Sequence, residues 1–454
     1  MPARVRKRRH EHDPGLESPR LKRHVHEFQG DMSGDSAPLS ALQPQRIWDR
    51  CDALGRLSEL PGGLTRVFLS PEQRQASDLV LGWMREAGMD ARVDAIGNCA
   101  GRYEGTVPGQ ACLMLGSHLD TVRDAGKYDG MLGVITAIEC VHALNACGSR
   151  LPFAVEVLGF GDEEGVRFGS TLLGSRAVAG TFDHAVLDNV DQRSMTMRDA
   201  LRDAGLDPAH IDAVARRPED VLAYAELHIE QGPVLEAEGL ATGVVTAING
   251  GNRFQIELKG MAGHAGTVPM GLRRDALAAA SECVLAIERI AASMPAVVAT
   301  VGRIEALPGA MNVIPGQVRF SLDVRAPADD LRHAAAAAMR AACEAIAARR
   351  NVAMATALLW EAKTAPCNAD MQRQFAAAIE QEGGRAHRLP SGAGHDGMAL
   401  IAIAPIGMLF VRCTGGISHN PAEAVTLADV AAGARVLARF IASFTPPRNP
   451  MGVA

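Results

Sequence analysis

The sequence lacks the features of secreted, membrane-spanning and nucleic-acid-binding proteins. Its nine cysteines are an odd number and form no C-x-x-C pair, which disfavours a disulfide framework or a zinc finger and favours a reducing compartment. No apolar run is long enough to cross a bilayer, and no apolar stretch follows the N-terminal charges as a signal peptide requires. The formal net charge of -6 provides no general basic surface for nucleic acid. We therefore expect a cytoplasmic protein with no membrane or nucleic-acid partner.

Aromatic residues are also scarce, at 4% of the chain, whereas alanine and glycine are plentiful. The longest apolar stretch, MALIAIAPIGMLFV (398–411), is broken by Pro405 and Gly407, and we predict buried strand there. The first 37 residues are rich in basic side chains and predict a solvated, disordered tail. Met32 begins a more ordinary N-terminal segment, so we also consider residues 1–31 an artefact of the assigned start site.

Helical and strand-like segments alternate from residue 38 onward, which is typical of an α/β fold with a mostly parallel central sheet. Short continuous apolar runs such as ACLMLGS (111–117) suit strands that are covered on both faces. Between residues 250 and 361 the order strand, helix, strand, strand, helix, strand predicts a ferredoxin-like α+β unit. We therefore predict a large α/β domain of residues 38–249 and 362–446, interrupted by a small domain of residues 250–361 that closes over a site between them as a lid.

Histidines and acids gather where the predicted strands end. His118 and Asp120 follow ACLMLGS, and Glu163 and Glu164 follow PFAVEVLGF (152–160). The carboxyl ends of parallel strands meet at one edge of a sheet, where α/β folds bind their ligands. Neighbouring acids raise each other's pKa unless a cation compensates. A pair of metal ions is the simplest compensation, and zinc also lowers the pKa of bound water to about 7, which provides a nucleophile at neutral pH.

Two further histidines complete a mixed imidazole and carboxylate set, which suits borderline divalent metals. They are His228 in AELHIEQGP and His419 in GGISHNPAE. Each histidine alone is better explained as a hydrogen-bonded structural residue, and the Glu163–Glu164 pair alone as an exposed acidic turn. Their coincidence in one α/β framework predicts a metal site.

Many ordered motifs support this interpretation: GSHLDTV, GKYDGMLGV, GDEEGVRFGSTLLGSRAVAG, LHIEQGPVLE, GMAGHAGTVPM, MNVIPG, SGAGHDGMA and GGISHNPAE. Together they resemble the dinuclear-metal amidohydrolases of the hydantoinase/carbamoylase family. That family includes allantoate amidohydrolases, N-carbamoyl-L-amino acid hydrolases and β-ureidopropionases, and it is akin to co-catalytic metallo-aminopeptidases. The resemblance extends from Pro38 to the C-terminus.

The resemblance implies two divalent metal ions per subunit, zinc or manganese, with cobalt and nickel also tolerated by such ligands. Their implied ligands are His118 and His228 for one ion, Glu164 and His419 for the other, and Asp129 as the bridge. Asp120 would lie behind His118 and fix its ring. Glu163 would be the general base and later the acid that protonates the departing nitrogen.

The resemblance also implies substrate contacts, by Gln231, Asn312, Arg325, Gly394 and His395. The planar donors of Arg325 suit a substrate carboxylate, although a surface pair with Asp323 on the same strand is an alternative. His264 would reach the active site of the partner subunit in a homodimer formed through residues 250–361, and would stabilise the oxyanion there. Taken alone, His264 is a polar residue in a glycine-rich turn. The family usually has a small residue such as alanine at the position of Gly397, and we expect this departure to be harmless.

The expected activity is hydrolysis of the terminal carbamoyl or ureido C–N bond of a small carboxylate, with release of ammonia and carbon dioxide. The histidine in LHIEQGP resembles the ureido-cleaving branch, since peptidase relatives usually have a carboxylate ligand there. We favour allantoate, an intermediate of purine catabolism, over an N-carbamoyl-L-amino acid. The alternatives are a metallo-dipeptidase or aminopeptidase of the same fold and a non-catalytic binding protein, and the complete set of predicted ligands argues against the latter.

Overall fold

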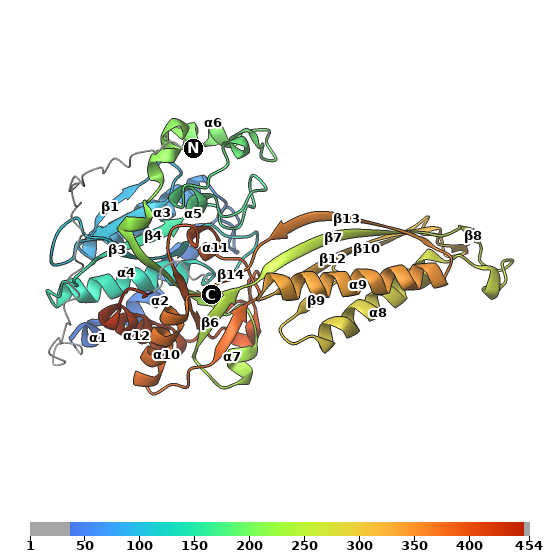
Figure 1. Ribbon diagram of the computed structural model, residues 1–454. Coiled ribbons are helices and arrows are strands. Elements are labelled where there is room, and N and C mark those ends of the chain that lie inside the picture. Colours follow the sequence, from blue (N-terminus) through green and yellow to red (C-terminus); the bar gives the residue numbers. More distant parts are fainter. Residues whose placement is uncertain (1–36, 449–454) are drawn as a thin grey trace, which may run out of the picture. The chain divides into compact units, whose positions relative to one another are not determined.

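The computed structural model describes residues 37–448, so the predicted tail lies outside the described residues except for Ala37 (Figure 1). A central sheet has the strand order β1-β2-β4-β3-β5-β16-β6-β14, and β15 also pairs with β6. Strands β4, β3, β5 and β16 run parallel to one another, so they end at the same edge. The strands are Asp90–Val93 (β1), Cys99–Tyr103 (β2), Cys112–His118 (β3), Ala154–Phe160 (β4), Val221–Ile229 (β5), Thr242–Ile248 (β6), Ala365–Pro366 (β14), Arg388–Ser391 (β15) and Ile406–Val411 (β16).

Helices cover both faces of this sheet and bury two separate apolar cores (Figure 1). On one face lie Ala37–Ala41 (α1), Pro44–Gly55 (α2), Pro71–Glu86 (α3), Met131–Ala146 (α4), Ala369–Gln381 (α10) and Leu427–Ser443 (α12). On the other lie Leu173–Val178 (α5), Met197–Asp203 (α6), Val234–Ala237 (α7) and Gly397–Leu400 (α11). In β3, Leu113 and Leu115 join the first core and Met114 the second. The prediction that this strand is covered on both faces is therefore confirmed. Short 3₁₀ helices occur at His184–Asp188, Pro208–Val214, Pro218–Asp220, Met270–Leu272 and Thr414–Gly416.

A second, antiparallel sheet forms from residues between β6 and β14, in the order β10-β12-β7-β13, with β9 also paired to β12. Its strands are Gly250–Lys259 (β7), Val298–Thr300 (β9), Ile304–Leu307 (β10), Gln317–Ala326 (β12) and Ala353–Ala362 (β13). Helices Ala276–Ser293 (α8) and Asp329–Arg349 (α9) pack on it through a third core. The short strands Gly263–His264 (β8) and Val313–Ile314 (β11) pair with each other. The run AVVATVGRIEAL (296–307) forms two strands, β9 and β10, because Gly302 and Arg303 lie outside both and the Arg303 N–H bonds the Ser321 hydroxyl.

The prediction of buried strand across residues 398–411 is wrong for its first half. Gly397–Leu400 is helix α11, and β16 begins only at Ile406. The Leu400 N–H donates to the Asp396 carbonyl, which closes the helical turn, and Pro405 has no N–H to donate to a strand ladder. A continuous apolar run does not distinguish a buried helix from a buried strand. Among the described helices, none has the length and hydrophobicity of a membrane span.

Candidate metal centre

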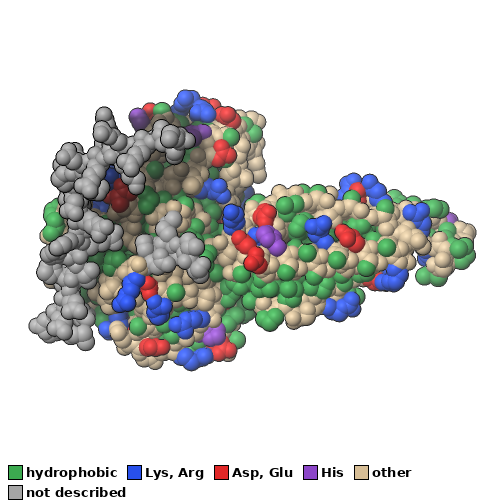
Figure 2. All heavy atoms as spheres, in the orientation of Figure 1, with side chains coloured by type: hydrophobic (Ala, Val, Ile, Leu, Met, Phe, Trp, Pro, Cys, Tyr) green, Lys and Arg blue, Asp and Glu red, His purple; other side chains and the backbone are tan. Residues whose placement is uncertain are grey.

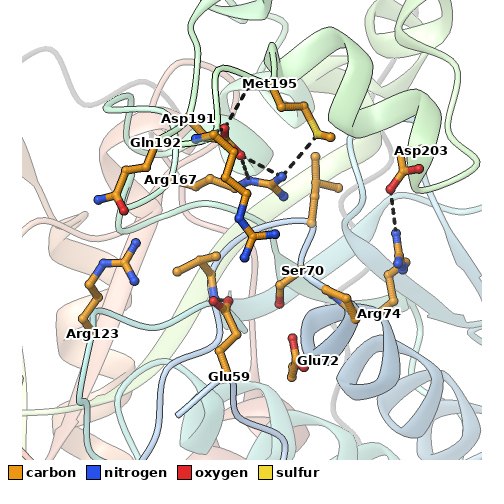
Figure 3. A pocket seen from close by; sticks show the side chains of 14 residues that line it. Glu59, Ser70, Glu72, Arg74, Arg123, Arg167, Asp191, Gln192, Met195 and Asp203 are labelled. Atoms are coloured by element: carbon orange, nitrogen blue, oxygen red, sulfur yellow. Dashed lines mark hydrogen bonds and ion pairs between the residues drawn. The ribbon is translucent and has the colours of Figure 1, made fainter.

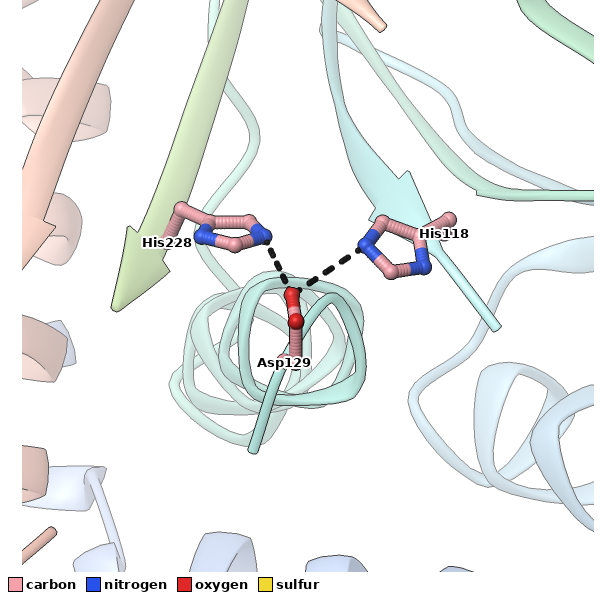
Figure 4. Close-up of side chains that lie close together, drawn as sticks. All are labelled: His118, Asp129 and His228. Carbon is pink, nitrogen blue, oxygen red and sulfur yellow. Dashed lines mark ion pairs between the residues drawn. The ribbon is translucent and has the colours of Figure 1, made fainter. Parts of the chain in front are cut away.

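Neighbouring elements of the central sheet bring His118, His228 and Asp129 together (Figure 4). His118 ends β3, and His228 is the second-last residue of β5, which pairs with β3. Asp129 lies in the loop that leads into α4, and both imidazoles point toward its carboxylate (Figure 4). The predicted site edge of the sheet therefore carries a compact cluster of ligand atoms.

The carboxylate of Asp129 lies between two groups of potential metal ligands. Its Oδ1 is 3.4 Å from His118 Nε2 and 3.1 Å from His228 Nε2. Its Oδ2 is 3.2 Å from His419 Nε2, and that nitrogen is 3.6 Å from Glu164 Oε1. In each of the two groups, the ligand atoms lie within 4.8 Å of one another. All five side chains predicted as metal ligands thus meet, in two groups that share Asp129.

Backbone carbonyls fix the orientation of two of these imidazoles. His118 Nδ1 lies 2.9 Å from the Asp120 carbonyl, and His228 Nδ1 lies 2.9 Å from the Ile229 carbonyl. A carbonyl only accepts hydrogen bonds, so each Nδ1 carries a proton and each Nε2 is left to bind a cation. The ring nitrogen that faces Asp129 is therefore the one suited to metal binding.

The acids of the cluster are buried, and their pKa values are shifted. Burial raises the pKa of Glu164 to about 7 and that of Glu163 well above its ordinary value. Burial also acts to raise the pKa of Asp129, but hydrogen bonds from His118, His228 and His419 hold it well below its ordinary value. Burial acts to lower the pKa of His118, but its bond to Asp129 and the surrounding acids raise it well above its ordinary value. Buried acids this close together need compensating positive charge. A protonated imidazole provides that charge, and a bound metal ion can provide it instead.

Asp120 lies next to His118, but its carboxylate has another partner. Its Oδ1 accepts a hydrogen bond from the Glu163 N–H at 3.1 Å, and its Oδ2 accepts one from the Glu164 N–H at 3.2 Å. The Asp120 carboxylate is 3.9 Å from His118 Nδ1, and the direct contact to that ring comes from the Asp120 backbone. Asp120 therefore holds the turn that presents both glutamates.

A pocket of about 650 Å³ opens over the cluster, and residues of the second sheet also line it. Gln231, Arg325 and Gly394 are on its wall. The Gln231 side-chain amide donates to Asp129 Oδ2 at 3.0 Å. The guanidinium of Arg325 bonds the Asp323 carboxylate and the Gly392 carbonyl, so a substrate carboxylate would compete with Asp323. A Cβ at Gly394 would lie 4.0 Å from Glu163 Oε1, which places this glycine beside the glutamate.

Besides Asp120, three predicted site residues do not line this pocket. His264 and Asn312 lie together at the β8–β11 pair, where the Ala265 N–H donates to the Asn312 carbonyl. His395 is buried, with Nε2 2.8 Å from the Ser391 hydroxyl and its ring centroid 4.4 Å from that of His228. His395 thus supports the His228 ring from behind.

Residues 114–443 match the sequence model of a protein family, peptidase family M20/M25/M40. The chain belongs to this family. It is 43% identical over 397 residues to the N-carbamoyl-L-amino acid amidohydrolase of Geobacillus stearothermophilus, covering 87% of this chain and 97% of the relative. It is 39% identical over 446 residues to allantoate deiminase 1 of Glycine max, covering 90% and 92%. A hydantoinase/carbamoylase-family amidase from Burkholderia multivorans superposes with a TM-score of 0.84 at 34% identity, covering 89% of this chain and 98% of that chain. The predicted resemblance to the hydantoinase/carbamoylase family is confirmed.

Other polar residues of the chain lie close to the cluster. Glu226 belongs with His228 and His395 to a further group of potential ligand atoms that lie within 4.8 Å of one another. Glu226 accepts hydrogen bonds from the Ser117 hydroxyl at 2.8 Å and the Tyr224 hydroxyl at 2.9 Å. Its position two residues before His228 on β5 was the available signal, since such residues share a face of a strand. Ser418 and Glu423 belong to the same motif as His419, and the Ser418 hydroxyl lies 3.2 Å from Asp129 Oδ2 and 2.9 Å from Glu423 Oε2.

A second hollow of about 530 Å³ lies elsewhere on this M20/M25/M40 protein (Figure 3). Four arginines and four acidic residues line it, so their formal charges cancel. Arg167 pairs with Asp191 at 3.0 Å, and Arg74 approaches Asp203 at 3.8 Å (Figure 3). None of the predicted site residues lines it, so the pocket over the cluster of potential metal ligands is the candidate active site.

Proposed function

We propose that the chain is a metal-dependent amidohydrolase that cleaves the terminal carbamoyl or ureido C–N bond of a small carboxylate and releases ammonia and carbon dioxide. The observation that carries this proposal is the carboxylate of Asp129 between two groups of imidazole and carboxylate ligands. The relatives named above are enzymes for N-carbamoyl-L-amino acids and allantoate, both of which contain such a bond.

The ligand set fits two divalent ions that share Asp129. His118 and His228 would hold one, and Glu164 and His419 the other. Zinc and manganese suit this mixture of imidazole and carboxylate, and cobalt and nickel also tolerate it. When bound, such ions polarise a carbonyl and lower the pKa of water enough to provide a nucleophile near neutral pH.

Glu163 has the position and the protonation behaviour of a general base. Its carboxylate lies at the wall of the pocket beside Gly394 and within the same close group as His118 and Glu164. Burial raises its pKa well above the ordinary value, so it takes a proton from the attacking water more readily than an exposed glutamate. The same group then returns that proton to the departing nitrogen. Arg325 would bind the substrate carboxylate in place of Asp323.

We further propose that residues 250–361 form a ferredoxin-like lid and dimerisation domain. The order β10-β12-β7-β13 with two covering helices supports this. His264 and Asn312 do not line the pocket of their own chain, as expected for residues that contact the active site of a partner subunit. Exposed hydrophobic side chains also occur on this segment, among charged ones (Figure 2); they include Met261, Met270, Leu272 and Met311.

A substrate panel tests the proposed activity. Enzyme stripped of metal and reconstituted with zinc or manganese is given allantoate, N-carbamoyl-β-alanine, N-carbamoyl-L-amino acids and dipeptides, and ammonia release and dipeptide cleavage are measured. We expect ammonia from at least one ureido compound, with allantoate favoured. Cleavage of dipeptides without ammonia from any ureido compound would favour the peptidase alternative.

A further inference from the structure

Glu423 is a buried carboxylate that joins two loops of the metal cluster far apart in sequence. Its Oε1 accepts hydrogen bonds from the backbone N–H of Tyr128 at 2.9 Å and of Asp129 at 3.1 Å, across 294 residues of sequence in the latter case. Its Oε2 accepts one from the Ser418 hydroxyl at 2.9 Å. Ser418 directly precedes His419. One side chain therefore fixes both the backbone of Asp129 and the segment that carries His419.

The neighbouring chain leaves room for this carboxylate. A Cβ at Gly126 would lie 2.2 Å from Glu423 Cβ and 2.4 Å from its carboxyl carbon, a separation that no real contact reaches. Glycine at position 126 is thus what lets Glu423 reach the Tyr128 and Asp129 amides. The side chain is 4% exposed, so water does not readily replace it as the acceptor for those amides.

We propose that Glu423 is a positioning residue that holds Asp129 between the two groups of metal ligands. The inference rests on the proposed function, because it assumes that Asp129 is shared by two ions. Asp129 belongs to both groups, so a shift of its backbone moves the carboxylate away from His118 and His228 on one side and from His419 on the other. Loss of Glu423 therefore weakens both sites together.

The requirement is for hydrogen-bond acceptors, not for negative charge. Glutamine at position 423 keeps an oxygen for the two backbone N–H groups and offers its amide N–H to the Ser418 oxygen. The Ser418 hydroxyl is then free to donate to Asp129 Oδ2, which is 3.2 Å away. Methionine has a similar length but no strong acceptor, so it leaves two buried N–H groups unpaired. We expect Glu423→Gln to preserve the site and Glu423→Met to disrupt it.

The test measures zinc affinity and amide hydrogen exchange on full-length variants. Zinc is titrated into protein stripped of metal, and deuterium uptake of the 126–130 segment is followed in the metal-free state. For Glu423→Met we expect zinc binding to weaken by about 10–100-fold, the range for lost supporting contacts, and the Tyr128 and Asp129 amides to exchange at least about tenfold faster. Glu423→Gln should stay within about threefold of wild type in both.

Glu139 provides a matched control, because it is also buried and joins segments 96 residues apart by accepting the Gln43 N–H at 2.8 Å. Glu139→Met should lower the melting temperature yet leave zinc affinity and exchange at 126–130 unchanged. Gly126→Ala displaces Glu423 without removing it and should give the same result as Glu423→Met. It therefore tests the proposal even if Glu423→Met does not fold.

Wild-type zinc affinity and amide exchange in Glu423→Met or in Gly126→Ala would overturn the proposal. A wild-type protein that binds no pair of ions would instead refute the proposed function, and amide exchange in the metal-free protein would still report whether Glu423 holds the loop.

Discussion

At the scale of single residues, two adjacent glutamates have different surroundings. Asp120 accepts the backbone N–H groups of both Glu163 and Glu164, which fixes the turn between them. Glu164 then lies 3.6 Å from His419, whereas Glu163 lies beside Gly394. The turn thus presents one acid to the metal cluster and the other to the substrate space, although their sequence neighbourhood is the same.

Replacement of Glu163 tests this division of roles. Glu163→Gln keeps the size of the side chain but removes the proton acceptor, so kcat should fall by about 10²–10⁴-fold. Metal content should stay at the wild-type level, because Glu164 and the histidines are retained. Steady-state ammonia release and elemental analysis measure the two effects, with Glu59→Gln in the second hollow as a control of equal charge change. A kcat within about threefold of wild type would remove Glu163 from the proposed mechanism.

At the scale of secondary-structure elements, the start of α4 packs against the predicted metal ligands. Gly130 is the N-cap of α4 with φ of 69°, and a Cβ there would lie 2.5 Å from the His118 ring. Gly148, just beyond the other end of α4, also has a positive φ, of 66°, but a Cβ there would meet nothing within 4 Å. The two glycines share a backbone requirement and differ in their contact with the site.

This pair separates backbone strain from damage to the metal site. Gly148→Ala should cost about 1–2 kcal/mol of stability, because alanine disfavours a positive φ. Gly130→Ala should cost more, because its Cβ also meets the buried His118 ring. Only Gly130→Ala should weaken zinc binding, by at least about tenfold, since it displaces the His118 ring. Thermal unfolding and zinc titration provide the comparison. Equal zinc affinity in the two variants would show that the His118 ring tolerates the displacement.

The secondary-structure elements also differ in how well the sequence alone predicts them. Strand-like runs ending in His118 and near His228 predicted the site edge, because parallel strands place their ends together. The segment Gly397–Leu400 was not recognised as helix, because apolar composition suits either structure when both faces are buried. Glu423 was not recognised as a contact of Asp129, since its partners lie 294 residues away and no local pattern encodes such a pairing.

At the scale of the whole molecule, proton binding and metal binding compete. In the metal-free protein burial raises the pKa of Glu164 to about 7, so this carboxyl keeps its proton below that pH and must release it when an ion binds. Below pH 7, each unit of acidification should therefore weaken zinc binding by about tenfold for every proton released. Zinc titrations between pH 8 and 5.5 measure the slope. A zinc affinity that does not change between pH 7 and 6 would contradict the assignment of Glu164 as a ligand.

Subunit mixing tests the proposed dimer. If His264 completes the partner's site, Glu163→Gln and His264→Ala are each nearly inactive alone. A mixed dimer holds one site with both groups intact, so dissociation and random reassociation should restore about a quarter of wild-type activity. Light scattering verifies the dimer. Absence of any recovery in verified mixed dimers would place His264 outside the partner's site.

The central claim is that five side chains hold two cations that share one carboxylate, and counting the metal ions tests it most directly. Elemental mass spectrometry on zinc-reconstituted protein should give two ions per chain for wild type. His419→Ala should give about one, because the group of His118, Asp129 and His228 remains. A wild-type protein that retains only one ion per chain, or a His419→Ala variant that retains both, would contradict the account.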